Sequence, residues 1–282
     1  MQVIGCYAQT EIGHGSDVQS LETTATYVLG EDEFIINSPT VSSTKFWPGD
    51  MGIMANHALV FAQLIVKGKN HGVHSFIVKI RDENHKPLPG IEAGDIGPKI
   101  GFHSKDNGYL RFNNVRIPKK NMLRRYISVS KKGEIKIKGD PKVSYATMMT
   151  IRMYISCTYP KAYSQAITIA TRYSMFRRQF QDKTGREIPV IEYQLQQEKL
   201  IPRIAEFYAI TIAGNNIRKL CTQNFQNVRE KEDFSLMAEA HACLSFSKSY
   251  FSEIVYYGID ICRKACGGHG FSYYSGLPHL FY

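Results

Sequence analysis

The spacing of hydrophobic residues changes once along this chain, close to Asp140 and Pro141. From Thr23 to Pro118, short runs rich in β-branched and aromatic residues alternate with turn residues, a pattern typical of antiparallel sheet. Beyond Pro141, apolar residues recur at intervals of three and four, which is typical of amphipathic helices. We therefore predict an α+β fold in which an antiparallel β domain is followed by an α-helical bundle.

The same change of period predicts the domain boundaries. We expect residues 1–121 to form the β domain, residues 141–282 the helical domain, and residues 122–140 a linker. The predicted linker is rich in Lys and Arg, which is typical of a solvated loop. A chain of 282 residues is long enough for two such domains.

Three local features sharpen these expectations. Gly30-Glu31-Asp32 separates two β-rich runs and predicts a hairpin. The alternation of buried positions changes parity across Asn113-Asn114, so we expect a bulge or bend there that restores one buried face. Pro160 and Pro202 fall inside helical patterns, and each is expected to kink or interrupt its helix unless it begins a new one.

Composition excludes several classes of protein. The 35 Lys and Arg residues exceed the 25 Asp and Glu residues by 10, which favours anionic ligands, including phosphate-bearing cofactors. The basic stretch lacks the interleaved aromatic residues that stack on bases, so we expect no nucleic-acid binding. No apolar run reaches the roughly 18 residues of a membrane helix, so we expect no membrane span.

The six cysteines predict neither a metal site nor a disulfide framework, because they are scattered and form no C-x-x-C pair. Cys262 and Cys266 share a helix face, which buried free thiols explain. Glycine-rich segments at Gly13–Gly15, Trp47–Gly49 and Gly267–Gly270 could let backbone approach a ligand closely. None follows a strand and opens a helix as a Rossmann motif does.

A series of segments forms a recognisable pattern when taken in order: Tyr7–Asp17, Leu21–Tyr27, Trp47–Gly49, Lys86–Ile91, Gly94–Lys99, Asp106–Leu110, Arg172–Ser174, Arg177–Gln179 and Ala265–Ser272. Together these segments resemble the acyl-CoA oxidases, flavoproteins of the acyl-CoA dehydrogenase superfamily. The resemblance covers nearly the whole chain and is specific because several unrelated segments agree in the same order.

The resemblance implies a central β domain and a C-terminal helical domain, which in the family follow an N-terminal helical domain. It also implies FAD as the cofactor. The family oxidises a fatty acyl-CoA to the trans-2-enoyl-CoA in fatty acid β-oxidation, and in oxidases oxygen then reoxidises the flavin with formation of hydrogen peroxide. A dehydrogenase, which passes its electrons to a protein acceptor, is the alternative within the enzyme class.

Site residues also follow from the resemblance. Thr10, Trp47 and Gly49 would line the isoalloxazine ring, with the Thr10 hydroxyl bonding a ring heteroatom. Ser16 would lie near the acyl-CoA. Arg177 and Gln194 would reach the FAD of a neighbouring subunit, and Gly267, Gly268 and Gly270 would let backbone approach the same cofactor.

The resemblance also predicts what this chain lacks. We expect the N-terminal helical domain and the segment with the catalytic glutamate to be missing, so that the helical domain is incomplete. Some members of the superfamily carry the catalytic glutamate at another position, which corresponds to the region near Ile151. This chain has no such base there, since residues 141–181 contain no Asp or Glu. No catalytic residue is therefore assigned, and His14 and His269 are interpreted as structural. Asp50 would place a carboxylate where the flavin approaches. Its negative charge would repel the reduced ring, which is anionic.

Two hypotheses about function remain, one for an enzyme and one for a structural protein. Either the chain is an incomplete acyl-CoA oxidase, inactive alone, or it is a catalytically silent structural subunit of a larger assembly. In both, a second copy or other protein subunits would cover apolar surface that the missing domain leaves exposed. Fatty acyl-CoA is the expected substrate if the protein is active. Family resemblance implies the peroxisome, a mitochondrial assembly is the alternative, and the chain shows no targeting signal.

Overall fold

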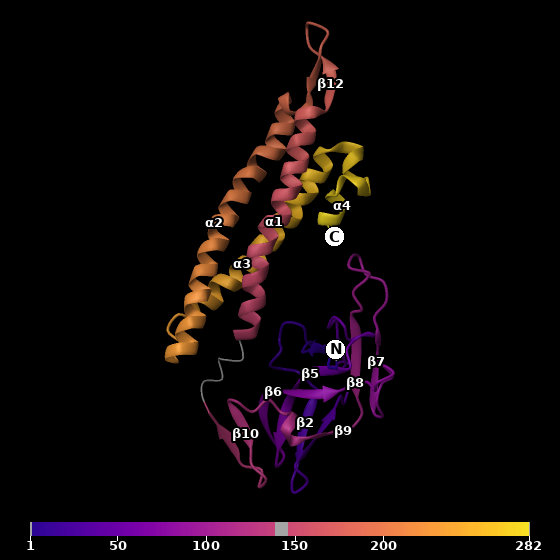
Figure 1. Ribbon diagram of the computed structural model, residues 1–282, viewed down its shortest axis with the longest axis vertical. Helices are drawn as coiled ribbons and strands as arrows, with labels where there is room; N and C mark the ends of the chain where they lie inside the picture. The colour runs from indigo at the N-terminus through magenta and orange to yellow at the C-terminus, as the bar shows by residue number, and fades with distance from the viewer. Residues whose placement is uncertain (1, 139–145, 282) are drawn as a thin grey trace. The chain divides into compact units, whose positions relative to one another are not determined.

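The computed structural model describes residues 2–138 and 146–281. The chain divides into two compact units, Met1–Pro141 and Lys142–Tyr282 (Figure 1). The first is built from strands and the second mainly from helices, which confirms the predicted α+β class. None of the described helices is both long and apolar enough to cross a bilayer.

A six-stranded sheet forms the centre of the first unit (Figure 1). Its order is β1-β5-β2-β3-β9, and β6 pairs with β5 in addition. A three-stranded sheet of order β4-β8-β7 and the β10–β11 hairpin complete the described strands of this unit. The bounds are β1 Gly5–Ala8, β2 Thr24–Val28, β3 Glu33–Asn37, β4 Lys45–Phe46, β5 His57–Val66, β6 Lys69–Lys79, β7 Ile91–Asp95, β8 Gly108–Phe112, β9 Val115–Pro118, the 3₁₀ turn η1 Lys119–Asn121, β10 Ile127–Val129 and β11 Ile135–Ile137.

The central sheet is mixed, which corrects the expectation of a purely antiparallel sheet. The predicted β2–β3 hairpin is antiparallel, but β5 runs parallel to both β1 and β2. Residues 38–56 explain the difference. This long connection contributes β4 to the other sheet and returns the chain to the six-stranded sheet in the direction of β2, whereas a tight turn would reverse it.

The core of the first unit follows the two-residue period of its strands. Alternate residues of β5 are buried from Ala58 to Val66, and they pack with Phe34 and Phe76, whose ring centroids lie 5.1 Å apart. The predicted bend at Asn113-Asn114 is confirmed. Asn114 has φ of 51°, and at this point the chain leaves β8 of one sheet and enters β9 of the other.

The range predicted to be a linker holds the β10–β11 hairpin, in which Val129 pairs with Ile135. Val129 and Met122 are buried in the core of the first unit. Hydrophobic residues of this basic segment therefore pack onto the β unit, while its Lys and Arg side chains remain exposed.

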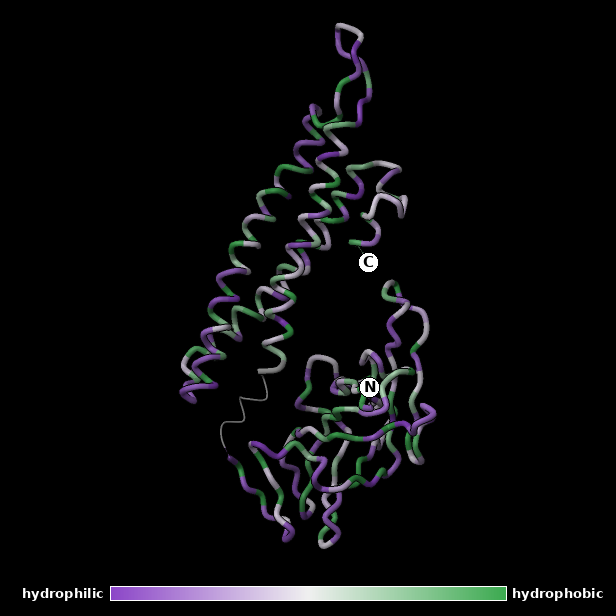
Figure 2. Tube along the Cα trace, viewed as in Figure 1, coloured by the Kyte–Doolittle hydropathy of each residue, from purple (hydrophilic) through white to green (hydrophobic). Residues whose placement is uncertain are grey.

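Three long helices and a short one form the second unit, and the β12–β13 hairpin extends from the end of α1 (Figure 1). The tip of this hairpin is mostly hydrophilic (Figure 2). The bounds are α1 Ala146–Phe176, β12 Arg178–Gln181, β13 Glu187–Pro189, η3 Val190–Glu192, α2 Gln194–Lys231, α3 Met237–Ala265, η4 Gly267–Gly270, η5 Tyr273–Ser275 and α4 Leu277–Phe281.

Both prolines lie inside continuous helices, so the expected interruptions are absent. Pro160 cannot donate to the carbonyl of Ser156, four residues earlier. Gly214 of α2 lies against this carbonyl, where a Cβ would come within 2.8 Å of the oxygen. The helices thus approach closely at the proline, and tertiary packing outweighs the lost hydrogen bond.

Buried polar contacts join the three long helices. Tyr163 of α1 is fully buried, and its hydroxyl donates to Glu206 Oε2 of α2 at 2.9 Å. Burial and Glu206 together raise the pKa of Tyr163, so this phenol stays protonated. Its ring lies against Gly258 of α3, where a Cβ would be 2.2 Å from the hydroxyl oxygen.

Replacing Gly258 with alanine is expected to destabilise the helical unit by about 1 to 3 kcal/mol, because the added methyl group overlaps a buried ring. Chemical unfolding followed by circular dichroism at the helical wavelengths measures this. Gly268→Ala is the matched control, since nothing lies within 4 Å of a Cβ at that exposed position. Equal midpoints for the two variants would contradict the packing argument.

Candidate cofactor-binding site

In the first unit the structure brings Thr10 beside Trp47, two residues predicted to line a flavin. Phe46 N donates to Thr10 O at 3.1 Å, and Thr10 Oγ1 donates to Phe46 O at 2.7 Å. The next residue of the first segment, Glu11, forms an antiparallel bridge with Lys45. The two segments therefore run side by side, with Thr10 next to the residue that precedes Trp47.

Trp47 presents its indole at the surface, with 56% of the residue exposed. Its ring meets Phe46 edge-on with centroids 5.7 Å apart. The backbone is fixed: Trp47 N donates to Gly108 O at 3.1 Å, and Asn107 Nδ2 donates to Trp47 O at 2.6 Å. Trp47 has φ of 84°, a conformation that a side chain of this size rarely adopts. The backbone that carries this flat ring is thus fixed, one residue beyond the Phe46 that pairs with Thr10.

Gly49 and Asp50 are covered by the side chain of Lys105. A Cβ at Gly49 would lie 2.4 Å from Lys105 Cε, and Lys105 Nζ lies 2.5 Å from Asp50 Oδ1. This ion pair offsets the negative charge that Asp50 is expected to place where the flavin approaches. Both partners are more than one-third exposed, so the pair contributes little stability and Lys105 can move aside.

Arg81 holds the loop that follows this turn. The residue is 2% exposed, and its guanidinium donates to Ala55 O at 2.7 Å and to Met51 O and Gly52 O at 2.8 Å each. Burial lowers the pKa of Arg81, but the three carbonyl acceptors compensate the buried N–H groups. On the other side, Asp106 accepts from Ile53 N and Met54 N.

Sequence reasoning missed the buried pair of Glu11 and Lys45. Both side chains are completely buried, and Lys45 Nζ lies 2.9 Å from Glu11 Oε1. Burial lowers the pKa of Lys45 to about 8, although Glu11 opposes this shift. Burial by itself would raise the pKa of Glu11, yet Lys45 and hydrogen bonds from Thr23 and Glu22 lower it below its ordinary value. No sequence signal marks Lys45, while Glu11 lies within the Tyr7–Asp17 motif.

Ser16 is exposed, beyond a turn in which Glu11 and His14 exchange backbone hydrogen bonds. His14 Nδ1 lies 3.4 Å from Glu11 Oε2. The structure gives Ser16 a place on the surface near the Thr10 segment, and it gives His14 a contact with the buried carboxylate.

In the second unit, Arg177, Gln194 and Gly267 gather at one end of the three long helices. Gln196 Nε2 donates to Ser174 Oγ of α1 and to Ala265 O of α3, each at 2.8 Å. Arg177 follows Ser174 by three residues, Gln194 precedes Gln196 by two, and Gly267 follows Ala265 by two. Both Arg177 and Gln194 are exposed; Arg177 bonds Gln179, and Gln194 bonds Glu198.

The glycines of this end differ in their surroundings. Nothing lies within 4 Å of a Cβ at Gly267 or Gly268, so backbone is accessible there, and Gly267 has φ of 55°. A Cβ at Gly270 would lie 1.8 Å from Arg263 O. The lack of a side chain at Gly270 is therefore explained by packing within the unit, while that at Gly267 and Gly268 leaves open surface.

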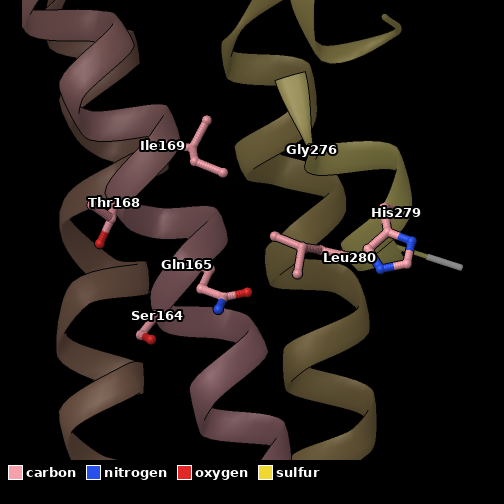
Figure 3. A pocket seen from close by; sticks show the side chains of 7 residues that line it. All are labelled: Ser164, Gln165, Thr168, Ile169, Gly276, His279 and Leu280. Carbon is pink, nitrogen blue, oxygen red and sulfur yellow. The ribbon is translucent and has the colours of Figure 1, made fainter. Parts of the chain in front are cut away.

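A separate hollow of about 410 Å³ lies between α1 and the C-terminal segment (Figure 3). Gln165 and Ile169 of α1 and Leu280 of α4 point toward this space (Figure 3). None of the predicted site residues lines it. Among the residues that the structure describes, no group of three or more His, Cys, Asp or Glu side chains could hold a metal ion.

The residues of each unit fit FAD. An isoalloxazine ring needs a flat apolar neighbour and nearby polar backbone, which Trp47 and Thr10 provide together. At Gly49, the atoms nearest to the space of a side chain belong to the flexible end of Lys105. In the other unit, the open backbone at Gly267 and Gly268 and the cation of Arg177 suit a phosphate-bearing ligand.

The carboxylate of Glu11 is expected to make the first unit acid-sensitive. Its lowered pKa means that the stabilising contribution is complete above about pH 4.5 and is lost as the pH falls through the folded-state value. Glu11→Gln should therefore flatten the decline in unfolding free energy below pH 4.5. At neutral pH it should cost about 3 to 5 kcal/mol, because Lys45 loses its buried partner.

Trp47, the single tryptophan of the chain, reports this unfolding by its fluorescence. Glu83→Gln is the matched control, since Glu83 belongs to an exposed pair with Lys79 in the same unit. The same slope below pH 4.5 in wild type and Glu11→Gln would argue against the assignment.

Comparison with known proteins finds similar domains for both units of the chain. The acyl-CoA dehydrogenase middle domain matches residues 6–115, and the acyl-CoA oxidase C-alpha1 domain matches residues 145–282. The putative peroxisomal acyl-coenzyme A oxidase 1.2 of Arabidopsis thaliana is 47% identical over 287 residues, and the human peroxisomal acyl-coenzyme A oxidase 1 is 46% identical over 286. Each alignment covers 100% of this chain and 43% of the relative.

Solved structures of acyl-CoA oxidases also resemble this chain. Acyl-CoA oxidase 1 of Arabidopsis thaliana superposes with a TM-score of 0.95 at 46% identity, over 100% of this chain and 44% of that one. Acyl-CoA oxidase-2 of Caenorhabditis elegans, solved with FAD, ascaroside-CoA and ATP, gives 0.93 at 42% identity over 99% of this chain and 42% of its own. The chain thus spans less than half the length of these relatives. It belongs to the acyl-CoA oxidase family of the acyl-CoA dehydrogenase superfamily.

Proposed function

We propose that this chain is the part of an FAD-dependent acyl-CoA oxidase that supplies its central β domain and part of its C-terminal helical domain. The whole protein would oxidise a fatty acyl-CoA to the trans-2-enoyl-CoA and form hydrogen peroxide. The observation that carries this proposal is the pairing of the Thr10 and Trp47 segments in a chain that matches acyl-CoA oxidases throughout its length.

The chain's own residues would bind and orient the cofactor. Trp47 would pack against the isoalloxazine ring, and Thr10 and adjacent backbone N–H groups would bond its polar edge. Lys105 would leave the space over Gly49 when the ring approaches. When bound, FAD would supply the redox chemistry as the hydride acceptor. In the helical unit, Arg177, Gln194, Gly267 and Gly268 would bind the phosphate and adenine part of a cofactor.

We assign the base that removes the substrate proton to no described carboxylate. Glu11 is buried in an ion pair, and Asp50 is paired with Lys105. In the helical unit, residues 141–181 contain no Asp or Glu. Catalysis would therefore need a proton acceptor other than Glu11 and Asp50, and residues 141–181 supply none. Ser16, on the surface near Thr10, is proposed to contact the acyl-CoA.

We propose a peroxisomal location, since the Arabidopsis and human relatives compared by sequence are named as peroxisomal oxidases. A catalytically silent structural subunit, in a mitochondrial assembly or elsewhere, is the alternative. The two hypotheses differ in an observable property of this chain: the oxidase requires that Trp47 remain available to a flavin, and the structural subunit does not.

For the purified chain we expect weak, reversible FAD binding and no peroxide from palmitoyl-CoA. FAD should quench Trp47 fluorescence, because the ring would lie against the indole, but the cofactor should be lost on gel filtration. Titration of Trp47 fluorescence and a coupled peroxidase assay measure the two properties. Absence of quenching at millimolar FAD would count against the cofactor site. A tightly bound flavin, or measurable peroxide, would show that the chain is more complete than we propose.

We also expect the purified chain to self-associate or to bind further subunits, because exposed apolar side chains mark interaction surfaces. In the first unit Ile100 and Phe102 are 88% and 76% exposed, and Ile53 and Met54 are exposed as well. Sedimentation velocity across a concentration series tests this expectation. A monodisperse monomer at high concentration would refute it.

A further inference from the structure

The ammonium of Lys45 connects three separate segments of the first unit. It donates to Glu11 Oε1 at 2.9 Å, to Gln9 O at 3.0 Å and to Phe61 O at 2.6 Å. A lysine has three N–H donors, so these bonds use all of them. The side chain is completely buried and therefore has no water as an alternative partner.

The carboxylate of Glu11 is equally saturated. Its Oε1 atom also accepts from Thr23 N at 3.0 Å and from Thr23 Oγ1 at 2.5 Å, and Oε2 accepts from Glu22 N at 2.8 Å. Hydrogen bonds from several directions fix both the position and the orientation of the Glu11 carboxylate.

The pair joins the two segments proposed to contact the flavin. Glu11 follows Thr10 in the chain, and Phe46 and Trp47 follow Lys45. The two backbones are bridged at Glu11 and Lys45, and the Thr10–Phe46 hydrogen bonds come next in the ladder. Any shift of the ion pair would move Thr10 and Trp47 relative to each other.

The contribution of the ion pair to local geometry can be distinguished from its contribution to stability. Replacing both members of a buried ion pair with uncharged residues of similar size is often neutral for stability, because the desolvation cost of the charges disappears with their attraction. Such residues cannot hold Gln9 O, Phe61 O and Glu11 in one arrangement. The specific contribution of the pair is therefore directional.

We infer that the buried Glu11–Lys45 ion pair positions Thr10 and Trp47 for the flavin, so that Glu11 and Lys45 are positioning residues of the cofactor site. This inference rests on the proposed function for the identity of the ligand. The order that the pair imposes on Trp47 is independent of any ligand and can be measured without one.

The experiment compares wild type with Lys45→Met, Glu11→Gln and the double variant in the full chain. Stability is followed by chemical unfolding, and the mobility of Trp47 by fluorescence anisotropy and acrylamide quenching. FAD affinity is followed by quenching of Trp47. Each single variant should lose stability, since one buried charge remains unpaired. The double variant should recover most of that stability but keep a more mobile Trp47 and bind FAD about tenfold more weakly.

Two further variants complete the design. Lys79→Met with Glu83→Gln removes an exposed ion pair of the same unit and should leave all three properties unchanged. Thr23→Val removes the hydroxyl contacts to Glu11 and to Ser43 O but keeps both charges of the pair, and it should shift Trp47 mobility slightly in the same direction. This milder variant decides the question if the double variant does not fold.

A double variant with wild-type anisotropy, acrylamide quenching and FAD affinity would overturn the inference, and so would an unchanged Trp47 in a folded Thr23→Val protein. If wild type itself shows no FAD quenching, the proposed cofactor role fails. The Trp47 mobility of the variants then still decides whether the pair positions this turn.

Discussion

The buried ion pair of Glu11 and Lys45 is the interaction on which the candidate site depends. Two charges without access to water persist only if every donor and acceptor is satisfied, and here the partners come from segments that are distant in sequence. The pair thus forces the Thr10 segment, β4 and β5 into one arrangement. Because Thr10 and Trp47 adjoin it, the geometry of the exposed site is set by a contact that lies beneath it.

The surface of this site is less rigid than its base. Trp47 has a fixed backbone, and Arg81 and Asp106 hold the loop that follows. Lys105, in contrast, covers Gly49 through an exposed ion pair with Asp50. Such a pair is weak in water, so its side chain can yield to a ligand while the framework stays in place. A fixed backbone around Trp47 and a displaceable Lys105 side chain over Gly49 are suited to binding a cofactor after the unit has folded.

In the helical unit, close packing and the side-chain amide of Gln196 hold the candidate residues at one end of the helices. Gln196 joins α1 to α3 and so gathers Arg177, Gln194 and Gly267 at one end. The glycines there serve different needs: Gly270 makes room for Arg263 O, while Gly268 leaves its backbone open. A glycine-rich string therefore mixes packing and accessible backbone, and only the three-dimensional surroundings of each glycine distinguish them.

The sequence by itself determined the α+β class, the β2–β3 hairpin and the bend at Asn113-Asn114, because these depend on local periodicity and turn residues. Its ordered motifs also determined the family. Only the tertiary structure decided that β5 runs parallel to its neighbours, that α1 continues through Pro160, and that Lys45 is a buried partner of Glu11. Strand direction, helix packing and charge pairing depend on contacts between residues far apart in the chain, and those contacts leave no local pattern in the sequence.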